Sequence, residues 1–126
     1  MSDRTVEKPW GHEDRWAITD RYLGKLLYIK AGHRLSKQYH EEKDETIYVL
    51  SGSLLLELGP HSDQVEDLPG TIAPAGIKIV LKEGEVQRIE PGIVHRYCAD
   101  KEDVVLIEVS TPEINDVIRL EDDYDR

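Results

Sequence analysis

Several features that mark secreted, membrane-bound or nucleic-acid-binding proteins are scarce in this sequence. Cys98 is the single cysteine, so no disulfide can form within the chain. No apolar run approaches the length of a membrane span, and the first residues lack the hydrophobic centre of a signal peptide. There are 16 basic and 26 acidic residues, and the resulting net charge of −10 repels nucleic-acid phosphates and anionic lipids. We therefore expect a cytoplasmic protein with no nucleic-acid partner and no membrane partner.

The chain is short, and little in it predicts helix. Its 126 residues allow one hydrophobic core but not a substrate domain plus a separate cofactor domain. Apolar runs recur between Gly, Pro and Asp residues, which is the rhythm of an all-β sandwich or barrel. Only residues 113–118 show a turn of helical spacing, and residues 59–75, with three prolines, predict an irregular connection. The apolar runs are LGKLLYIKAG, DETIYVLSG, SLLLELGP, GIKIVLKEG, GIVHRYCAD and DVVLIEVSTP.

Three polar side chains are expected together on the inner face of the predicted strands. Gln38 and His40 are two positions apart, so both project from the same face of an extended strand. Glu45 follows a short polar turn and shares the parity of Ile47 and Val49, which places its carboxylate on the apolar face of the next strand. A buried carboxylate is costly without a cation. The cluster is therefore a candidate metal site.

His95 is the candidate for a fourth metal ligand. It begins an apolar strand just after the turn-forming Glu90-Pro91-Gly92, from which it can reach the other three side chains across a barrel. Taken alone, a strand histidine is usually a hydrogen-bonded side chain, and a glutamate after a turn is usually solvated. The ordered spacing is more specific. It runs Gly32, five residues, Gln38-x-His40, four residues, Glu45, six residues, Gly52, and later Gly84, five residues, Glu90-Pro91-Gly92-x-x-His95.

These two stretches resemble the paired signature motifs of the cupin superfamily. The resemblance implies an all-β, small single-domain cupin, which is a double-stranded β-helix or jelly-roll barrel. It also implies one divalent metal ion, held by Gln38, His40, Glu45 and His95. Homodimerisation through strand edges is a further expectation from cupins generally.

The sequence departs from the cupin pattern at three positions. Gln38 stands where most cupins have histidine, Glu90 where proline is common, and Ala99 where asparagine is common. Over residues 1–126 we expect one cupin domain, with an N-terminal arm over 1–11, a barrel over about 12–111 and a closing segment over 112–126.

From Lys8 to Arg126 the chain is similar to type II mannose-6-phosphate isomerases, whose cupin domain is fused in longer proteins to a mannose-1-phosphate guanylyltransferase. The similarity implies interconversion of mannose 6-phosphate and fructose 6-phosphate, an aldose-ketose isomerisation through an enediol, and it makes the acidic C-terminus part of the fold. No glycine-rich phosphate loop is present, so nucleotidyl transfer is not expected. The matching segments are Lys8-Pro9-Trp10-Gly11, Leu35-Ser36-Lys37-Gln38-Tyr39-His40, Glu45, Val49-x-Ser51-Gly52, Pro91-Gly92-x-x-His95-Arg96, Ile107-Glu108-Val109, and Val117 to Glu121 with Asp122, Tyr124 and Arg126.

The isomerase resemblance also suggests roles for other residues. The metal would act as a Lewis acid, with zinc favoured by the family, although manganese, iron, cobalt and nickel suit the same nitrogen and oxygen donors. The base that moves a proton between adjacent carbons could be Lys25, Lys43 or Tyr97. Lys37 and Arg96 are candidates for binding the sugar phosphate, although strict alternation turns Arg96 away from the metal. Lys43 stands where the family has arginine, and the two are not equivalent for bidentate phosphate binding.

Other functions remain open from the sequence. One is a cupin enzyme acting on another sugar or small molecule, as an epimerase or an oxygenase. Gln38 in place of histidine weakens the donor set usual for oxygen activation. A second is a non-catalytic sugar-binding cupin, and a third is a barrel whose site holds no metal.

Overall fold

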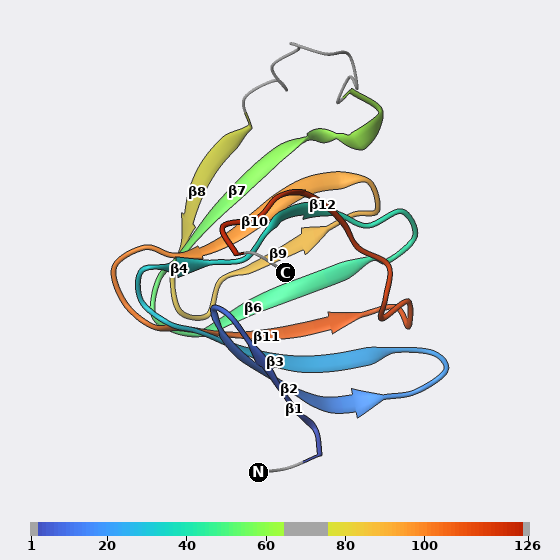
Figure 1. Cartoon of the computed structure of the whole chain (residues 1–126), viewed down its shortest axis with the longest axis horizontal. Helices are drawn as coiled ribbons and strands as arrows, with labels where there is room; N and C mark the ends of the chain where they lie inside the picture. The colour runs from blue at the N-terminus through green and yellow to red at the C-terminus, as the bar shows by residue number, and fades with distance from the viewer. Residues whose placement is uncertain (1–2, 65–75, 125–126) are drawn as a thin grey trace.

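The structure is a computed structural model, and it describes residues 3–64 and 76–124. Its strands form two antiparallel sheets that face one another (Figure 1). The first sheet has the strand order β1 (Thr5–Lys8), β2 (Gly11–Ile18), β3 (Leu23–Ile29), β11 (Val104–Ser110), β6 (Glu45–Ser51), β9 (Val86–Ile89). The second has the order β12 (Ile118–Glu121), β5 (Lys37–Tyr39), β10 (Ile93–Ala99), β7 (Leu54–His61), β8 (Ile77–Leu81), and β4 (His33–Arg34) also pairs with β10. The expected all-β architecture is confirmed.

The core lies between the two sheets because strand side chains alternate between faces. In β6, Glu45, Ile47 and Val49 are buried, whereas Tyr48 and Leu50 are exposed. β11 shows the same alternation, and its inward residues include a carboxylate, Glu108, as well as aliphatic side chains. Two strands that are otherwise apolar on their inner faces therefore carry acids into the barrel.

Strand β10 differs from β6 and β11, because it is buried on both faces from Val94 to Ala99. Its inward face carries His95 and Tyr97, and the C-terminal segment covers part of its other face. Arg96 donates to the carbonyl oxygens of Leu35 and Glu121 at 2.9 and 3.2 Å. The acidic C-terminal segment is therefore part of the fold, as expected, and its strand β12 pairs with β5.

The turns between strands explain the glycines of the sequence pattern. Gly52, between β6 and β7, has a φ of +82°, and a Cβ atom there would lie 2.4 Å from the carbonyl oxygen of Asp103. Only glycine fits such a turn without strain. Gly92 has a φ of +85° just before β10, so it starts the strand that carries His95.

The connections differ in part from expectation. Residues 59–64 are not irregular, because β7 extends to His61 and the 3₁₀ helix η1 (Ser62–Gln64) follows; residues 65–75 lie outside the described part. Residues 113–118 do not form a helix, because 114–115 are a turn and Ile118 begins β12. Within the expected N-terminal arm, β1 pairs with β2 and adds a strand to the first sheet. None of the helices in the described ranges is long and apolar enough to cross a membrane.

Candidate metal centre

Three of the predicted ligands meet at one point inside the barrel. Candidate ligand atoms of His40, Glu45 and His95 all lie within 4.8 Å of one another, and all three side chains are buried. Nε2 of His40 is 2.8 Å from Oε1 of Glu45, and Nε2 of His95 is 3.2 Å from the same oxygen. β6 and β10 belong to opposite sheets, so the cluster joins the two halves of the barrel.

The hydrogen bonds of the two imidazoles direct both Nε2 atoms toward Glu45. Nδ1 of His40 contacts the carbonyl oxygen of Asp116, and Nδ1 of His95 contacts that of Ile93. A carbonyl only accepts, so each Nδ1 carries the proton and, in the neutral ring, each Nε2 presents a lone pair. Nε2 of His95 and Oε2 of Glu45 are buried with no hydrogen-bond partner among the described residues. Lone pairs that converge in this way suit a divalent metal ion, and the carbonyl contacts are the usual support of metal-binding histidines.

Gln38 lies beside this cluster. It is the register partner of His95 across the β5–β10 pair, so both side chains lie on the same face of the second sheet. Its Oε1 accepts a hydrogen bond of 3.1 Å from the hydroxyl of Ser36. The amide is thus positioned on the correct face, and its role as a fourth ligand stays a prediction.

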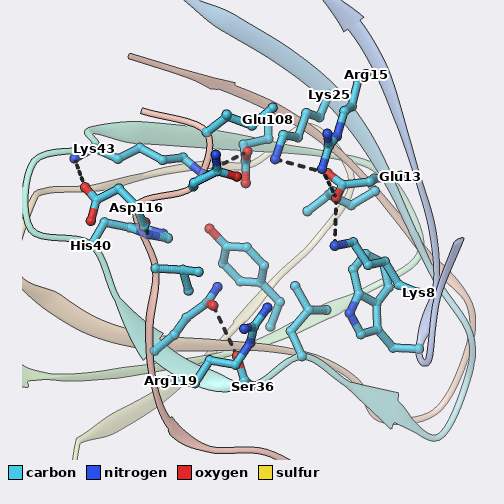
Figure 2. A pocket seen from close by; sticks show the side chains of 18 residues that line it. Lys8, Glu13, Arg15, Lys25, Ser36, His40, Lys43, Glu108, Asp116 and Arg119 are labelled. Atoms are coloured by element: carbon cyan, nitrogen blue, oxygen red, sulfur yellow. Dashed lines mark hydrogen bonds and ion pairs between the residues drawn. The ribbon is translucent and has the colours of Figure 1, made fainter. Parts of the chain in front are cut away.

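A cavity of about 290 Å³ opens next to the cluster. Figure 2 shows His40 and Asp116 on one side of it, Glu13 with its basic neighbours on the other, and Glu108 between Lys43 and Lys25. Polar and charged side chains dominate its lining. They are Lys8, Glu13, Arg15, Lys25, Ser36, Gln38, His40, Lys43, Tyr97, Glu108, Asn115, Asp116 and Arg119, joined by Trp10, Leu27, Leu35, Ile114 and Val117.

Lys43 lies between two buried carboxylates, Glu108 of the cavity lining and Glu45 of the candidate metal centre. Nζ of Lys43 is 3.6 Å from Glu108 and 3.8 Å from Glu45. Burial lowers the pKa of Lys43, but the negative charges of Glu108 and Glu45 outweigh it and raise that pKa. Burial, together with the charge of Glu45, raises the pKa of Glu108 to about 8. Burial tends to raise the pKa of Glu45 as well, but its close neighbours Glu108, His40 and His95 hold that pKa well below the usual range.

The other two predicted bases also line the cavity. The Tyr97 ring lies 5.3 Å from that of His95, and its buried hydroxyl has no hydrogen-bond partner among the described residues. Burial and the charges of Glu45 and Glu108 raise the pKa of Tyr97 well above its ordinary value, which makes the phenol a poor base. Nζ of Lys25 forms an ion pair of 3.0 Å with Glu13.

The two predicted phosphate-binding residues, Lys37 and Arg96, are not among the residues that line the cavity. The guanidinium of Arg96 is occupied by backbone carbonyls and lies 3.6 Å from the Glu121 carboxylate, because residue 96 alternates with the inward-facing His95. Lys37 alternates with Gln38 in the same way, and Glu121 on β12 is its register partner. Strand alternation thus places both cations away from the cavity.

Several cavity residues were missed at the sequence level. Glu108 shares the inward parity of Val104 and Leu106, so the argument that found Glu45 could also have found it. Glu13 is likewise buried in β2. Asp116 had no local signal, because it approaches His40 through a loop 76 positions further along the chain.

Comparison with known proteins identifies the family. The protein-family model described as a cupin domain matches residues 25–110, about two thirds of the chain. The chain belongs to the cupin family, and the membership expected from the motifs is confirmed. The barrel fold and the cluster of two histidines and one glutamate agree with this membership.

Curated relatives narrow the resemblance. The chain is similar to mannose-1-phosphate guanylyltransferase 2 of Escherichia coli O157:H7, with 30% identity over 127 residues that cover 98% of this chain and 23% of that protein. It is also similar to the xanthan biosynthesis protein XanB of Xanthomonas campestris pv. campestris (strain B100), with 30% identity over 98% of this chain and 24% of the relative. The chain therefore spans about a quarter of the length of these relatives.

Solved structures share the fold at lower identity. The capsular polysaccharide assembling protein CapF from Staphylococcus aureus aligns over 93% of this chain and 34% of its own, with a TM-score of 0.75 and 21% identity. KdgF from Halomonas sp. aligns over 90% of this chain and 91% of its own, with a TM-score of 0.68 and 19% identity. These similarities confirm the cupin fold.

Proposed function

We propose that this cupin is a metal-dependent sugar-phosphate isomerase that interconverts mannose 6-phosphate and fructose 6-phosphate. The observation that carries the proposal is the convergence of His40, Glu45 and His95 beside a polar cavity. The guanylyltransferase relatives, whose names refer to mannose 1-phosphate, support the choice of sugar.

The proposed ligands of one divalent ion are His40, Glu45, His95 and the amide oxygen of Gln38. This set carries a single negative charge, so the bound ion keeps a net positive charge. When bound, the ion supplies Lewis-acid stabilisation of negative charge on a sugar oxygen. Zinc is the first choice by resemblance to the isomerase family, because the donor set alone suits manganese, iron, cobalt and nickel equally.

Proton transfer is the step that the protein itself must perform. Of the groups that line the cavity, we assign it to Glu108, because its carboxyl group lies beside Lys43 and has no hydrogen-bond partner at Oε2 among the described residues. The carboxylate would remove a proton from the carbon next to the sugar carbonyl, and the same proton would be delivered to the former carbonyl carbon. The hydroxyl proton on the first carbon would pass to the former carbonyl oxygen in the enediol stage, so that the carbonyl group ends on the neighbouring carbon. Lys43, positively charged, would hold the Glu108 carboxylate in place.

The decisive experiment is an isomerase assay on protein of measured metal content. Wild-type protein should convert mannose 6-phosphate to fructose 6-phosphate, His40→Ala should lose both metal and turnover, and Glu108→Gln should keep the metal and lose turnover. Glu102→Gln, which changes an exposed carboxylate in a turn, is the matched control and should behave as wild type. A protein that binds stoichiometric metal through His40 but shows no turnover would refute the isomerase.

Such a result would favour the alternatives, which are action on another small molecule or non-catalytic sugar binding. The same barrel would then use its metal and cavity for recognition alone. We further propose that the active form is a homodimer, with the apolar outer face of the first sheet rather than its strand edges as the interface.

A further inference from the structure

A group of basic side chains surrounds one carboxylate on the side of the cavity away from His40 (Figure 2). Glu13 is 3.0 Å from Nζ of Lys25, 3.3 Å from Nζ of Lys8 and 3.4 Å from Nη2 of Arg15. We call these four residues the Glu13 cluster. All of them line the cavity, and they come from three adjacent strands, β1, β2 and β3. None of them belongs to the candidate metal centre.

The Glu13 cluster carries excess positive charge. Three cations share one carboxylate, so the cluster has a net charge of +2 with all four groups ionised. If the nearby Glu108 is counted as ionised too, one positive charge still remains in excess. This excess contrasts with a whole-chain charge of −10. A salt-bridge network that served only the fold would need no such surplus, and a positively charged recess in an acidic protein attracts anions selectively.

The geometry leaves these cations available to a ligand. The Lys8 and Arg15 side chains are 24% and 28% exposed, whereas Glu13 is only 5% exposed, so the cluster presents its basic groups to the cavity opening and keeps its acid beneath them. The Arg15 guanidinium uses Nη2 to contact Glu13, and the rest of this partly exposed side chain lies in the cavity lining. A guanidinium flanked by two ammonium groups matches the oxygens of a phosphate.

We propose that the Glu13 cluster is the binding site for the phosphate group of a phosphorylated sugar, and that Lys8, Arg15 and Lys25 make the contacts. Glu13 is a positioning residue that holds the three cations together. The inference rests on the proposed sugar-phosphate function, because it places the phosphate at the Glu13 cluster and the reacting carbons near the metal centre. The proposed site makes Lys25 a phosphate ligand instead of the base. Its three cations take the phosphate-binding role expected from the sequence for Lys37 and Arg96.

A phosphate monoester fits this site better than a sugar carboxylate. It carries a charge of about −1.5 to −2 at neutral pH and offers three acceptor oxygens. A carboxylate carries one charge and two oxygens, which leaves part of the excess charge unmatched. Both ligands share anionic chemistry, so the experiment must separate them.

Calorimetric titration of the 126-residue chain tests the proposal, with and without added zinc. The ligands are mannose 6-phosphate, mannose, glucuronate and inorganic phosphate. We expect mannose 6-phosphate to bind at least about tenfold more tightly than mannose or glucuronate, and phosphate to compete with it. Lys25→Met and Arg15→Gln should each weaken mannose 6-phosphate binding by roughly tenfold or more and leave mannose binding unchanged. Both variants leave Glu13 with two cationic partners.

Matched controls change the same residue types at exposed positions outside the cavity. Lys30→Met and Arg21→Gln should bind all four ligands as the wild type does. The proposal is overturned if mannose 6-phosphate binds no more tightly than mannose, or if the Glu13-cluster variants bind it normally. It is also overturned if glucuronate binds as tightly with the same dependence on Lys25 and Arg15, which would make the site a carboxylate site.

Binding and turnover separate this inference from the proposed isomerase. Tight, cluster-dependent binding of mannose 6-phosphate without turnover would refute the isomerase and keep the phosphate site. Turnover with an unchanged KM in the Lys25→Met and Arg15→Gln variants would keep the isomerase and refute the phosphate site.

Discussion

At the scale of single residues, the positions of the histidine rings are decided by groups that are not ligands. Asp116 is the clearest example. Its backbone carbonyl accepts from Nδ1 of His40, and its carboxylate accepts from the backbone N–H groups of residues 41, 42 and 43 at 3.0, 2.8 and 2.9 Å. One residue of the C-terminal segment thus orients a metal ligand and shapes the turn that carries Lys43.

Asp116→Ala keeps the backbone carbonyl but removes the carboxylate that anchors residues 41–43 next to His40, so it should loosen His40 and weaken metal binding without removing a ligand. We expect zinc affinity to fall about 10- to 100-fold, the range typical when support of a metal ligand is lost. Competition against a chromophoric chelator measures that affinity, and Asp100→Ala, at an exposed position outside the cavity, is the control. Equal zinc affinity in the two variants would show that the Asp116 carboxylate does not help to position His40.

The cations around Glu13 make the stability of the fold depend on pH. Burial tends to raise the pKa of Glu13, but the charge and hydrogen bond of Lys25 and the charges of Lys8 and Arg15 bring it below the ordinary value of 4.5. The ionised carboxylate therefore stabilises the fold above pH 4.5, and this contribution is lost as the pH falls through the lower pKa of the folded state.

The measurement is urea unfolding of wild type and Glu13→Gln at neutral pH and at several values below pH 4.5. At neutral pH the variant should be less stable by about 1.5–3 kcal/mol, because charged hydrogen bonds are lost. The difference should shrink as the pH falls. Glu7→Gln, which changes an exposed carboxylate of β1, should show neither effect. A pH-independent difference between wild type and Glu13→Gln would contradict the assignment.

At the scale of elements, the strands present their site residues correctly only if the turns between them keep their shape. Gly52 and Gly32 both have φ near +80°, at +82° and +81°, but their surroundings differ. A Cβ atom on Gly52 would collide with the Asp103 carbonyl, whereas one on Gly32 would meet nothing within 4 Å. Alanine substitutions at Gly32 and Gly52 therefore separate the destabilisation caused by positive φ from the destabilisation caused by steric collision.

We expect Gly32→Ala to lower the free energy of unfolding by about 1 kcal/mol, from the strain of positive φ alone. Gly52→Ala should cost about 3 kcal/mol or more, because strain and collision add. Chemical denaturation of both variants gives the comparison. Similar losses would mean that the β6–β7 turn adjusts freely to an added methyl group.

At the scale of the whole molecule, the first sheet has an unusually apolar outer face. Leu26, Ile107, Tyr48 and Val86 are register partners in one row across β3, β11, β6 and β9. Tyr48 and Val86 are 40% and 59% exposed. Contiguous exposed apolar surface of this kind marks an interface, which is the basis for the proposed homodimer.

Val86→Glu should convert the proposed dimer into a monomer, because it places a charge in that row. Val80 on β8 of the second sheet has nearly the same exposure, 57% against 59%, so Val80→Glu is a matched control that should stay dimeric. Analytical ultracentrifugation at micromolar concentrations distinguishes the two states. A monomeric wild type, or dissociation in both variants, would refute this interface.

The sequence alone determined the fold class and three of the residues that meet in the candidate metal centre. Strand alternation and the spacing of turns are local properties, so His40, Glu45 and His95 could be placed on inner faces from the sequence. The same alternation argument, applied to β11, would have added Glu108.

The tertiary structure decided which side chains share the cavity with that centre. The path of the C-terminal segment brings Asp116 to His40 and occupies Arg96, and the packing of β1, β2 and β3 gathers Lys8, Arg15 and Lys25 around Glu13. These contacts join residues that are far apart in the sequence, and a short-range pattern of apolar and polar residues does not encode such contacts. For this reason the metal-ligand motif could be predicted from the sequence, whereas the Glu13 cluster could be recognised only in the structure.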